Sequence, residues 1–268
     1  MTNPATHKER VVGGAGYALA GRLGAIIEAA SFVVFTWFYG AATFGLYAVL
    51  WSYVKVSSAI CEVAMTTALQ RFIPKAKKAN EGAIVGYALK LTILTSSLAA
   101  LCLIFAAPYL ANFINTSEAD AESLTAVIRL YTWVLPFWCI VNVATAAVRA
   151  TRTFGPEVKV RIFYEQGLRL ISATVFALMG FLAFGLFAAH LLSVFLSAIL
   201  ALRLLRKHYD LSAVFAAPVT GQQANEILKY GSSVMPAYLI KMLFSEFPVM
   251  FLNMLLPGAA GAAAGGFY

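Results

Sequence analysis

The chain has 268 residues, of which 61% are hydrophobic and only 12% are charged, and its mean hydropathy is +0.78. A soluble domain carries about 25% charged residues, so this composition excludes a soluble globular protein and predicts an all-helical integral membrane protein. The net charge of +8 implies no nucleic-acid partner, because the basic residues gather in the loops between apolar segments.

The N-terminal stretch MTNPATHKER is basic and precedes an apolar segment, as in a signal peptide. That segment is too long for a signal peptide, contains Arg22 and Glu28, and has no small-residue cleavage site. We therefore expect a retained first span. Since a span needs roughly 20 apolar residues, about seven spans are predicted, at 12–38, 44–69, 83–110, 124–149, 160–180, 184–205 and 229–256.

The loops between these segments alternate in charge. Lys and Arg occupy the N-terminus and the second, fourth and sixth loops, whereas the first, third and fifth loops carry none. Basic loops stay in the cytoplasm, so a cytoplasmic N-terminus is predicted. The basic residues are Lys8, Arg10, Arg71, Lys75, Lys77, Lys78, Arg149, Arg152, Lys159, Arg161, Arg203, Arg206, Lys207 and Lys229.

A weak internal repeat relates the first and seventh spans. When residues 12–42 are placed on 230–260 without gaps, Glu28 meets Glu246 and two GAA triplets coincide. Both segments end in a Gly/Ala stretch that we expect to be an outer loop. The copies point the same way, which predicts parallel repeats. The C-terminal GFY should then open an eighth span, as GLY opens the second.

The second span carries a family pattern. Gly45 and Tyr47 open it, Glu62 lies in the stretch EVAMTTALQRFIP, and Arg71 is followed by Phe72. This pattern, with the later segment FGPEVKVRIFYEQGLRLI, resembles the Wzx-type polysaccharide flippases, the O-antigen branch of the multidrug/oligosaccharidyl-lipid/polysaccharide (MOP) exporter superfamily. The resemblance covers the whole chain. It implies a MATE-like fold of two helical lobes around a central cavity.

The resemblance also implies the organisation and the function. A six-helix transmembrane lobe is expected at 1–205, a cytoplasmic amphipathic linker at 206–228, and the first helix of a truncated second lobe, with the start of the next, at 229–268. The protein would flip a polyprenyl-pyrophosphate-linked oligosaccharide across the bacterial cytoplasmic (inner) membrane for cell-surface polysaccharide such as lipopolysaccharide. Polysaccharide polymerase and glycosyltransferase machinery would be further partners, beside the lipid-linked glycan and the bilayer.

Charged residues inside the predicted spans form the candidate site, since such residues are costly in a bilayer and usually functional. Four cations reach similar, central depth. They predict a cationic cavity that receives a pyrophosphate, with Arg suited to bidentate contact and Lys acting as a point charge. The alternative is neutralisation by intramembrane carboxylates. The cations are Arg22, Lys55, Arg169 and Lys241, and the carboxylates are Glu28, Glu62, Glu165 and Glu246.

Two of these carboxylates suggest a further role. Glu28 and Glu246 coincide in the repeat, and a membrane carboxylate can carry a proton or help to hold a cation. Ion coupling is therefore one hypothesis, and pairing with Arg is the other.

Helical spacing also predicts that one face of the second span is polar and turned away from lipid. This face is formed by Trp51, Lys55, Ser58, Glu62 and Thr66.

Other functions stay open at this stage. A lipid II flippase shares the pyrophosphate, whereas a multidrug or cation antiporter would need an acidic or aromatic midplane. A membrane scaffold or glycan-assembly partner without transport activity belongs to another class.

No DxD, HExxH, GxSxG or P-loop motif is present, so no enzyme is predicted. No metal or cofactor is expected, because the three cysteines, Cys61, Cys102 and Cys139, lie in apolar runs without a CxxC motif.

Overall fold

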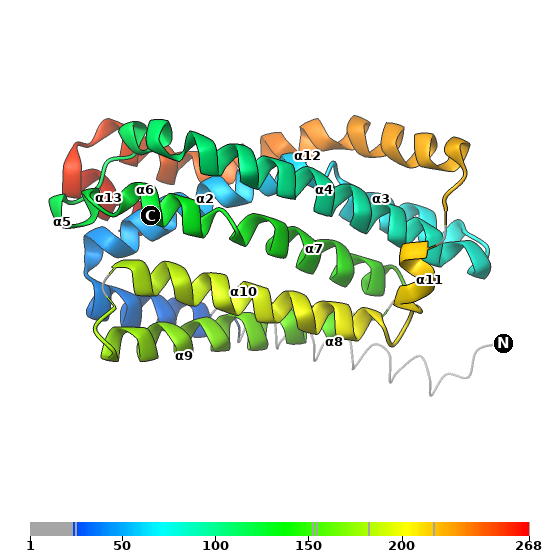
Figure 1. The fold of residues 1–268 in the computed structure, drawn as a ribbon, viewed down its shortest axis with the longest axis horizontal. Coiled ribbons are helices and arrows are strands. Elements are labelled where there is room, and N and C mark those ends of the chain that lie inside the picture. The colour runs from blue at the N-terminus through cyan, green and yellow to red at the C-terminus, as the bar shows by residue number, and fades with distance from the viewer. Residues whose placement is uncertain are drawn as a thin grey trace.

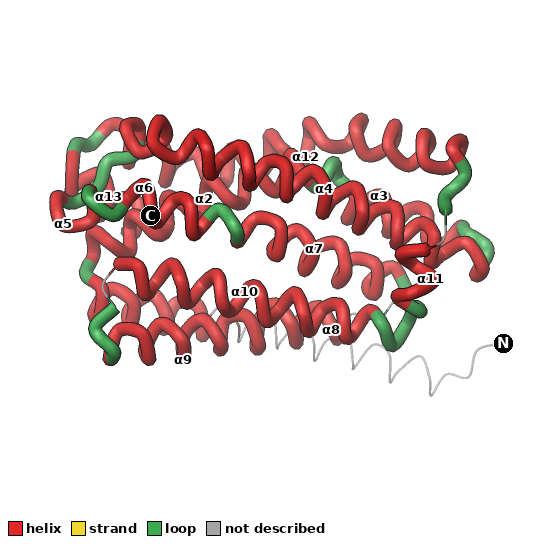
Figure 2. The backbone as a smooth tube through the Cα atoms, viewed as in Figure 1, coloured by secondary structure: helices red, strands yellow, loops and turns green. Residues whose placement is uncertain are grey.

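The computed structural model describes Gly24 and residues 26–151, 153, 155–181, 183–216 and 218–267. All regular structure in these residues is helical, and Figures 1 and 2 show the long helices side by side along the longest axis, with most loops near the ends. The elements are Ile26–Tyr39, α2 (Ala41–Cys61), α3 (Met65–Phe72), η1 (Ile73–Lys75), α4 (Lys78–Leu110), η2 (Ala111–Phe113), α5 (Glu118–Ala121), α6 (Leu124–Tyr131), α7 (Val134–Ala150), α8 (Gly155–Val158), η3 (Lys159–Tyr164), α9 (Glu165–Leu178), α10 (Ala183–Leu205), α11 (Leu211–Ala216), α12 (Gly221–Leu255) and α13 (Gly258–Phe267).

Five helical segments of the described chain are long and apolar enough to cross a membrane. They coincide with the predicted second, third, fourth, sixth and seventh spans, so the all-helical, multi-span membrane fold is confirmed. The segment predicted as the fifth span is the continuous helical run α8–η3–α9, whose middle part is a π-helix. The apolar helix Ile26–Tyr39 covers the described part of the predicted first span.

The core consists of two apolar clusters, one toward each end of the bundle. The first contains the N-terminal part of α7 and of α10, whereas the second contains the C-terminal part of the same helices. Buried polar side chains lie between the two clusters along the chain, among them Ser197 of α10 and Glu62 after α2. The bundle therefore buries polar groups near its middle, where a bilayer offers them no water.

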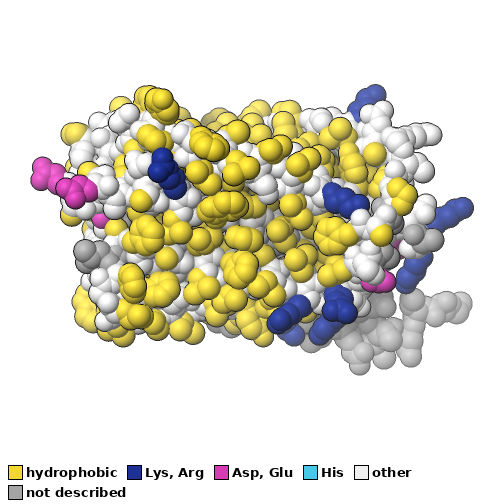
Figure 3. All heavy atoms as spheres, in the orientation of Figure 1, with side chains coloured by type: hydrophobic (Ala, Val, Ile, Leu, Met, Phe, Trp, Pro, Cys, Tyr) yellow, Lys and Arg dark blue, Asp and Glu magenta, His cyan; other side chains and the backbone are white. Residues whose placement is uncertain are grey.

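Charge separates the two ends of the bundle. On the face drawn in Figure 3, Lys and Arg gather mainly toward one end, and the acidic side chains at the other end belong to the segment around α5. This is the asymmetry that the loop pattern predicts. It is the basis for the predicted cytoplasmic N-terminus, which stays a prediction.

The second predicted span is broken just after Cys61. Val63 (φ 46°) and Ala64 (φ 51°) adopt left-handed backbone, which is an outlier for a β-branched residue. The carbonyl of Cys61 accepts a hydrogen bond from Thr95 Oγ1 at 2.6 Å. Gly231 of α12 comes so close that a Cβ atom there would lie 2.4 Å from the carbonyl oxygen of Val63. Neighbouring helices thus hold the break.

The C-terminal Gly/Ala segment is a helix, α13, so its prediction as a loop was wrong. The predicted first loop is likewise reduced to Gly40, between Tyr39 and α2. Alanine has the highest helix propensity, which the loop prediction underestimated. Gly40 (φ 83°) and Gly258 (φ 57°) both adopt left-handed backbone. They are equivalent positions of the weak repeat, so a similar turn occurs at both.

Close packing of α13 on α2 gives a first testable prediction. A Cβ atom on Gly45 would lie 1.7 Å from the carbonyl oxygen of Ala262, so Gly45→Ala should displace α13 and lower the stability by about 1–3 kcal/mol. Gly167→Ala is the matched control, because nothing lies within 4 Å of its Cβ position. Thermal unfolding in detergent measures both. Equal stability of Gly45→Ala and the wild type would contradict the close contact.

Candidate functional site: a polar cavity between the helices

A polar cavity lies among the spanning helices. It consists of two adjoining pockets of about 450 and 270 Å³, which share the lining residues Lys55, Trp138, Glu157 and Arg161. Helix α2, helix α7 and the run α8–η3–α9 supply most of the wall. Tyr238 of α12 lines the smaller pocket. Pockets of this size commonly hold small ligands or parts of larger ones.

The cavity wall carries both signs of charge in equal number among the described residues. The four cations are Lys55, Arg149, Arg161 and Arg169, and the four carboxylates are Glu28, Glu62, Glu157 and Glu165. Cations of the predicted cavity and carboxylates of the alternative, neutralisation, therefore both occur on this wall. An anion that enters must compete with carboxylates already near the cations.

Lys55 is the cation that links α2 to α12. Its Nζ lies 2.5 Å from Glu246 Oε2, and Ser52 Oγ donates to the same oxygen at 2.8 Å. The Lys55 side chain is 27% exposed, whereas that of Glu246 is 8% exposed. The cation therefore still faces the cavity while its carboxylate partner is buried between the two helices.

A second cationic group surrounds Glu157 at the start of the run α8–η3–α9. Arg149 Nη1 donates to both oxygens of Glu157, at 2.7 and 2.8 Å, and Arg161 Nη1 lies 3.8 Å from Oε1. The guanidinium of Arg161 also lies 4.7 Å from the centre of the Trp138 ring. Arg161 is thus held between an acidic and an aromatic partner, with its 36% exposed side chain at the cavity.

Two tryptophans and an amide complete the wall. Trp51 and Trp138 meet edge to face with ring centroids 4.9 Å apart. Asn142 donates from Nδ2 to Glu62 Oε1 at 2.6 Å, and its Oδ1 has no hydrogen-bond partner among the described residues. Glu62 is buried at the break after α2. Aromatic faces and amide groups are the pattern with which amphipathic ligands are bound.

The deepest charges belong to a buried network in the wall of the larger pocket. Arg169 Nη1 lies 3.6 Å from Glu165 Oε1 and donates to the hydroxyl of Tyr47 at 3.0 Å. His190 Nδ1 lies 2.7 Å from the Tyr131 hydroxyl and 3.1 Å from that of Tyr47. Its Nε2 lies 3.8 Å from Glu165 Oε1. With the proton on Nε2, His190 accepts from the hydroxyls and turns its N–H toward the carboxylate.

The structure brings together most of the predicted site residues. Lys55, Arg169, Glu28, Glu62 and Glu165 line the cavity, and Glu246 pairs with Lys55. The polar face predicted for the second span also lies on the wall, from Trp51 to Thr66. Lys241 is exposed and lines neither pocket. Arg22 lies outside the described residues.

Several residues of the site were missed by sequence reasoning. Arg149 and Arg161 were assigned to a basic loop and not to the predicted cavity. Trp138 and Asn142 stand four residues apart and therefore share a helical face of α7, which is a signal present in the sequence. His190 is the single histidine in the apolar segment of α10, and such isolated residues are usually satisfied in the core. No candidate metal-binding group occurs among the residues that the structure describes.

The comparison with known families assigns the chain. The family model described as polysaccharide biosynthesis protein matches residues 34–260, which is most of the chain. No curated protein and no solved structure gave a match. The chain therefore belongs to the polysaccharide biosynthesis protein family.

Proposed function

We propose that this member of the polysaccharide biosynthesis protein family flips a polyprenyl-pyrophosphate-linked oligosaccharide across the bacterial cytoplasmic membrane. The observation that carries the proposal is the polar cavity between spanning helices, in which cations stand beside two tryptophans. Such a cavity gives the polar part of a lipid-linked substrate a path that avoids hydrocarbon. The basic end of the bundle would face the cytoplasm.

Lys55 and Arg161 are the cations proposed to receive the pyrophosphate. They line both pockets, and each keeps exposed side-chain surface beside its carboxylate partner. Phosphate oxygens would replace Glu246 at Lys55 and Glu157 at Arg161. Because charge-assisted hydrogen bonds in a dry site are strong, this exchange would let the substrate alter contacts between α2 and α12.

The sugars would lie against Trp51, Trp138 and the amide of Asn142. Indole rings offer apolar faces. Asn142 lines the smaller pocket, and its buried carbonyl oxygen has no hydrogen-bond partner among the described residues, so a shift of the side chain would let it accept from a sugar hydroxyl. This part of the cavity would also suit the glycan of lipid II. Polymerase and glycosyltransferase partners are proposed from the family alone.

Depletion of the protein in its native host tests the proposal. We expect a lipid-linked glycan to accumulate in the cytoplasmic leaflet, because its polar headgroup cannot cross hydrocarbon unaided. Extraction and mass spectrometry identify it, and its protection from an impermeant periodate reagent reports the leaflet. Accumulation of lipid II would select that alternative. Unchanged levels and distribution of every lipid-linked glycan would reject the transport function.

A further inference from the structure

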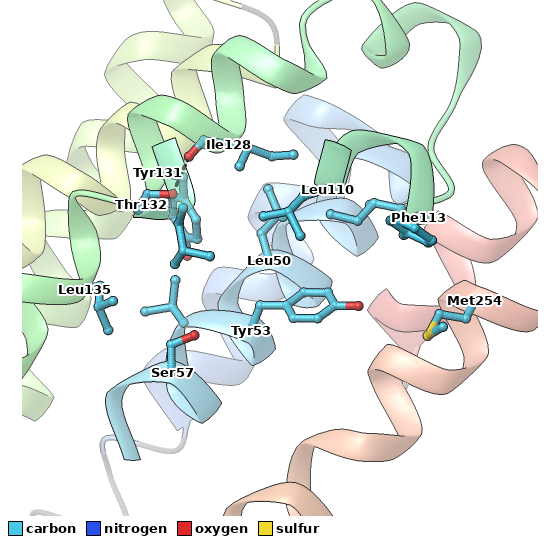
Figure 4. Close-up of a pocket in the computed structure, with 13 residues that line it drawn as sticks. Leu50, Tyr53, Ser57, Leu110, Phe113, Ile128, Tyr131, Thr132, Leu135 and Met254 are labelled. Atoms are coloured by element: carbon cyan, nitrogen blue, oxygen red, sulfur yellow. Dashed lines mark hydrogen bonds between the residues drawn. The ribbon is translucent and has the colours of Figure 1, made fainter. Parts of the chain in front are cut away.

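A second, apolar pocket lies on a different face of α2 from the polar cavity. Its volume is about 320 Å³, and Figure 4 shows its walls, formed by α2, by α6 and α7, by the end of α4 and by Met254 of α12. On α2 it is lined by Leu50, Tyr53, Val54 and Ser57. Their spacing of three to four residues places them on one helical face.

The pocket is closed at its inner end and open at its mouth. Leu135 and Tyr131 are buried, with exposures of 0% and 2%, whereas Phe113 and Met254 at the rim are 66% and 55% exposed. In Figure 4 the ring of Tyr53 points toward Met254, across the space between α2 and α12. The rim residues are apolar, exposed and part of segments of membrane-spanning length, so hydrocarbon that reaches this face would meet an apolar mouth.

The wall offers few hydrogen bonds to a ligand. The hydroxyl of Thr132 donates to the carbonyl of Ile128 at 2.7 Å, and the hydroxyl of Tyr131 is hydrogen-bonded to His190 Nδ1. The other lining side chains are apolar except for Ser57 and Tyr53. A space of this volume holds roughly ten methylene-sized groups, if each occupies about the 30 Å³ of a water molecule. Leaving it empty would forfeit dispersion contacts along its whole lining.

We propose that this pocket binds one acyl chain of a glycerophospholipid from the surrounding bilayer. Its mouth is bordered by exposed apolar side chains of spanning segments, and its wall suits a chain rather than a polar headgroup. Glycerophospholipids are the abundant chain-bearing molecules there, and occupancy follows concentration, whereas the carrier lipid of a biosynthetic glycan is scarce. The chain completes the packing between the end of α4 and α12, which contact each other little directly. This site is separate from the polar cavity and does not depend on the proposed transport function.

Photo-crosslinking in vesicles tests the site. The protein is reconstituted in phosphatidylethanolamine and phosphatidylglycerol, with phosphatidylethanolamine that carries a diazirine near the end of its acyl chain. Mass spectrometry should then find adducts on the lining segments 50–57, 110–114 and 128–135. Leu103→Trp and Leu110→Trp each fill the pocket and should lower the adduct yield there on the order of tenfold.

The control is Leu98→Trp, which alters an exposed position of α4 outside the pocket and should leave the yield unchanged. Elution as a single species on size exclusion shows that a variant has folded, and two filling variants guard against the failure of one. Equal yields in all variants would mean annular lipid and overturn the proposal. Displacement of the label by a small amount of polyprenyl phosphate would also overturn it, because the occupant would then be the carrier. None of these readouts requires transport.

Discussion

Export of the lipid-linked glycan should be lost when Lys55 and Arg161 are replaced together by glutamine. A charge-assisted hydrogen bond contributes about 1.5–3 kcal/mol, and 1.4 kcal/mol corresponds to tenfold. Each single replacement should therefore lower export by roughly tenfold to a hundredfold. Complementation of a depleted strain, scored by the amount of surface polysaccharide, measures the effect at matched protein levels.

The controls separate loss of a substrate contact from loss of folding. Lys55→Gln alone leaves Glu246 buried without its cation, which itself costs stability. The double variant Lys55→Gln/Glu246→Gln removes that charge and should recover the folded protein but not export. Lys90→Gln removes an exposed cation of α4 that lines neither pocket of the cavity and should export normally. Normal export by Lys55→Gln/Glu246→Gln would remove Lys55 from the site.

Arg169→Met should destabilise the protein by about 3–5 kcal/mol, the usual cost of leaving one buried charge without its partner. The side chains of Arg169 and Glu165 are only 3% and 5% exposed, so water cannot compensate. Tyr47 would also lose a hydrogen bond from the guanidinium. Thermal unfolding in detergent should show a large fall in the midpoint.

A charge-removing double variant makes this test specific. Arg169→Met/Glu165→Leu takes out both ions and should regain most of the lost stability, since apolar replacements of buried pairs are often tolerated. Arg161→Met is the comparison, because its side chain is 36% exposed and its loss should cost much less. If Arg169→Met keeps the stability of the wild type but loses export, Arg169 is a substrate ligand, as the sequence suggested, and the structural role is wrong.

The sequence was informative where one helix carries the whole signal. The polar face from Trp51 to Thr66 could be predicted because its members recur at helical spacing within one segment. The apolar runs located the spanning helices for the same reason. The repeat also gave a useful result, since it aligned Gly40 with Gly258, which share a left-handed backbone.

Pairing between distant helices could not be predicted in this way. Lys55 and Glu246 are far apart in sequence, and neither segment carries a pattern that predicts their contact. The same holds for His190, which only the packing of α10 brings to Glu165. The break after Cys61 was missed because it depends on Thr95 and the close approach of Gly231, not on a local Gly or Pro.

Helix α12 contrasts with α2 in how it is attached to the bundle. Among the described residues of this 35-residue helix, only Ile227, Gly231, Glu246 and Asn253 are buried. Asn253 exchanges hydrogen bonds with the backbone of Asn115 at 2.7 and 3.1 Å, near one end of the helix. Few buried contacts mean a low local stability. Lateral displacement of α12 would therefore break a small number of buried polar contacts, among them the Lys55–Glu246 pair, while it leaves most of both apolar clusters intact.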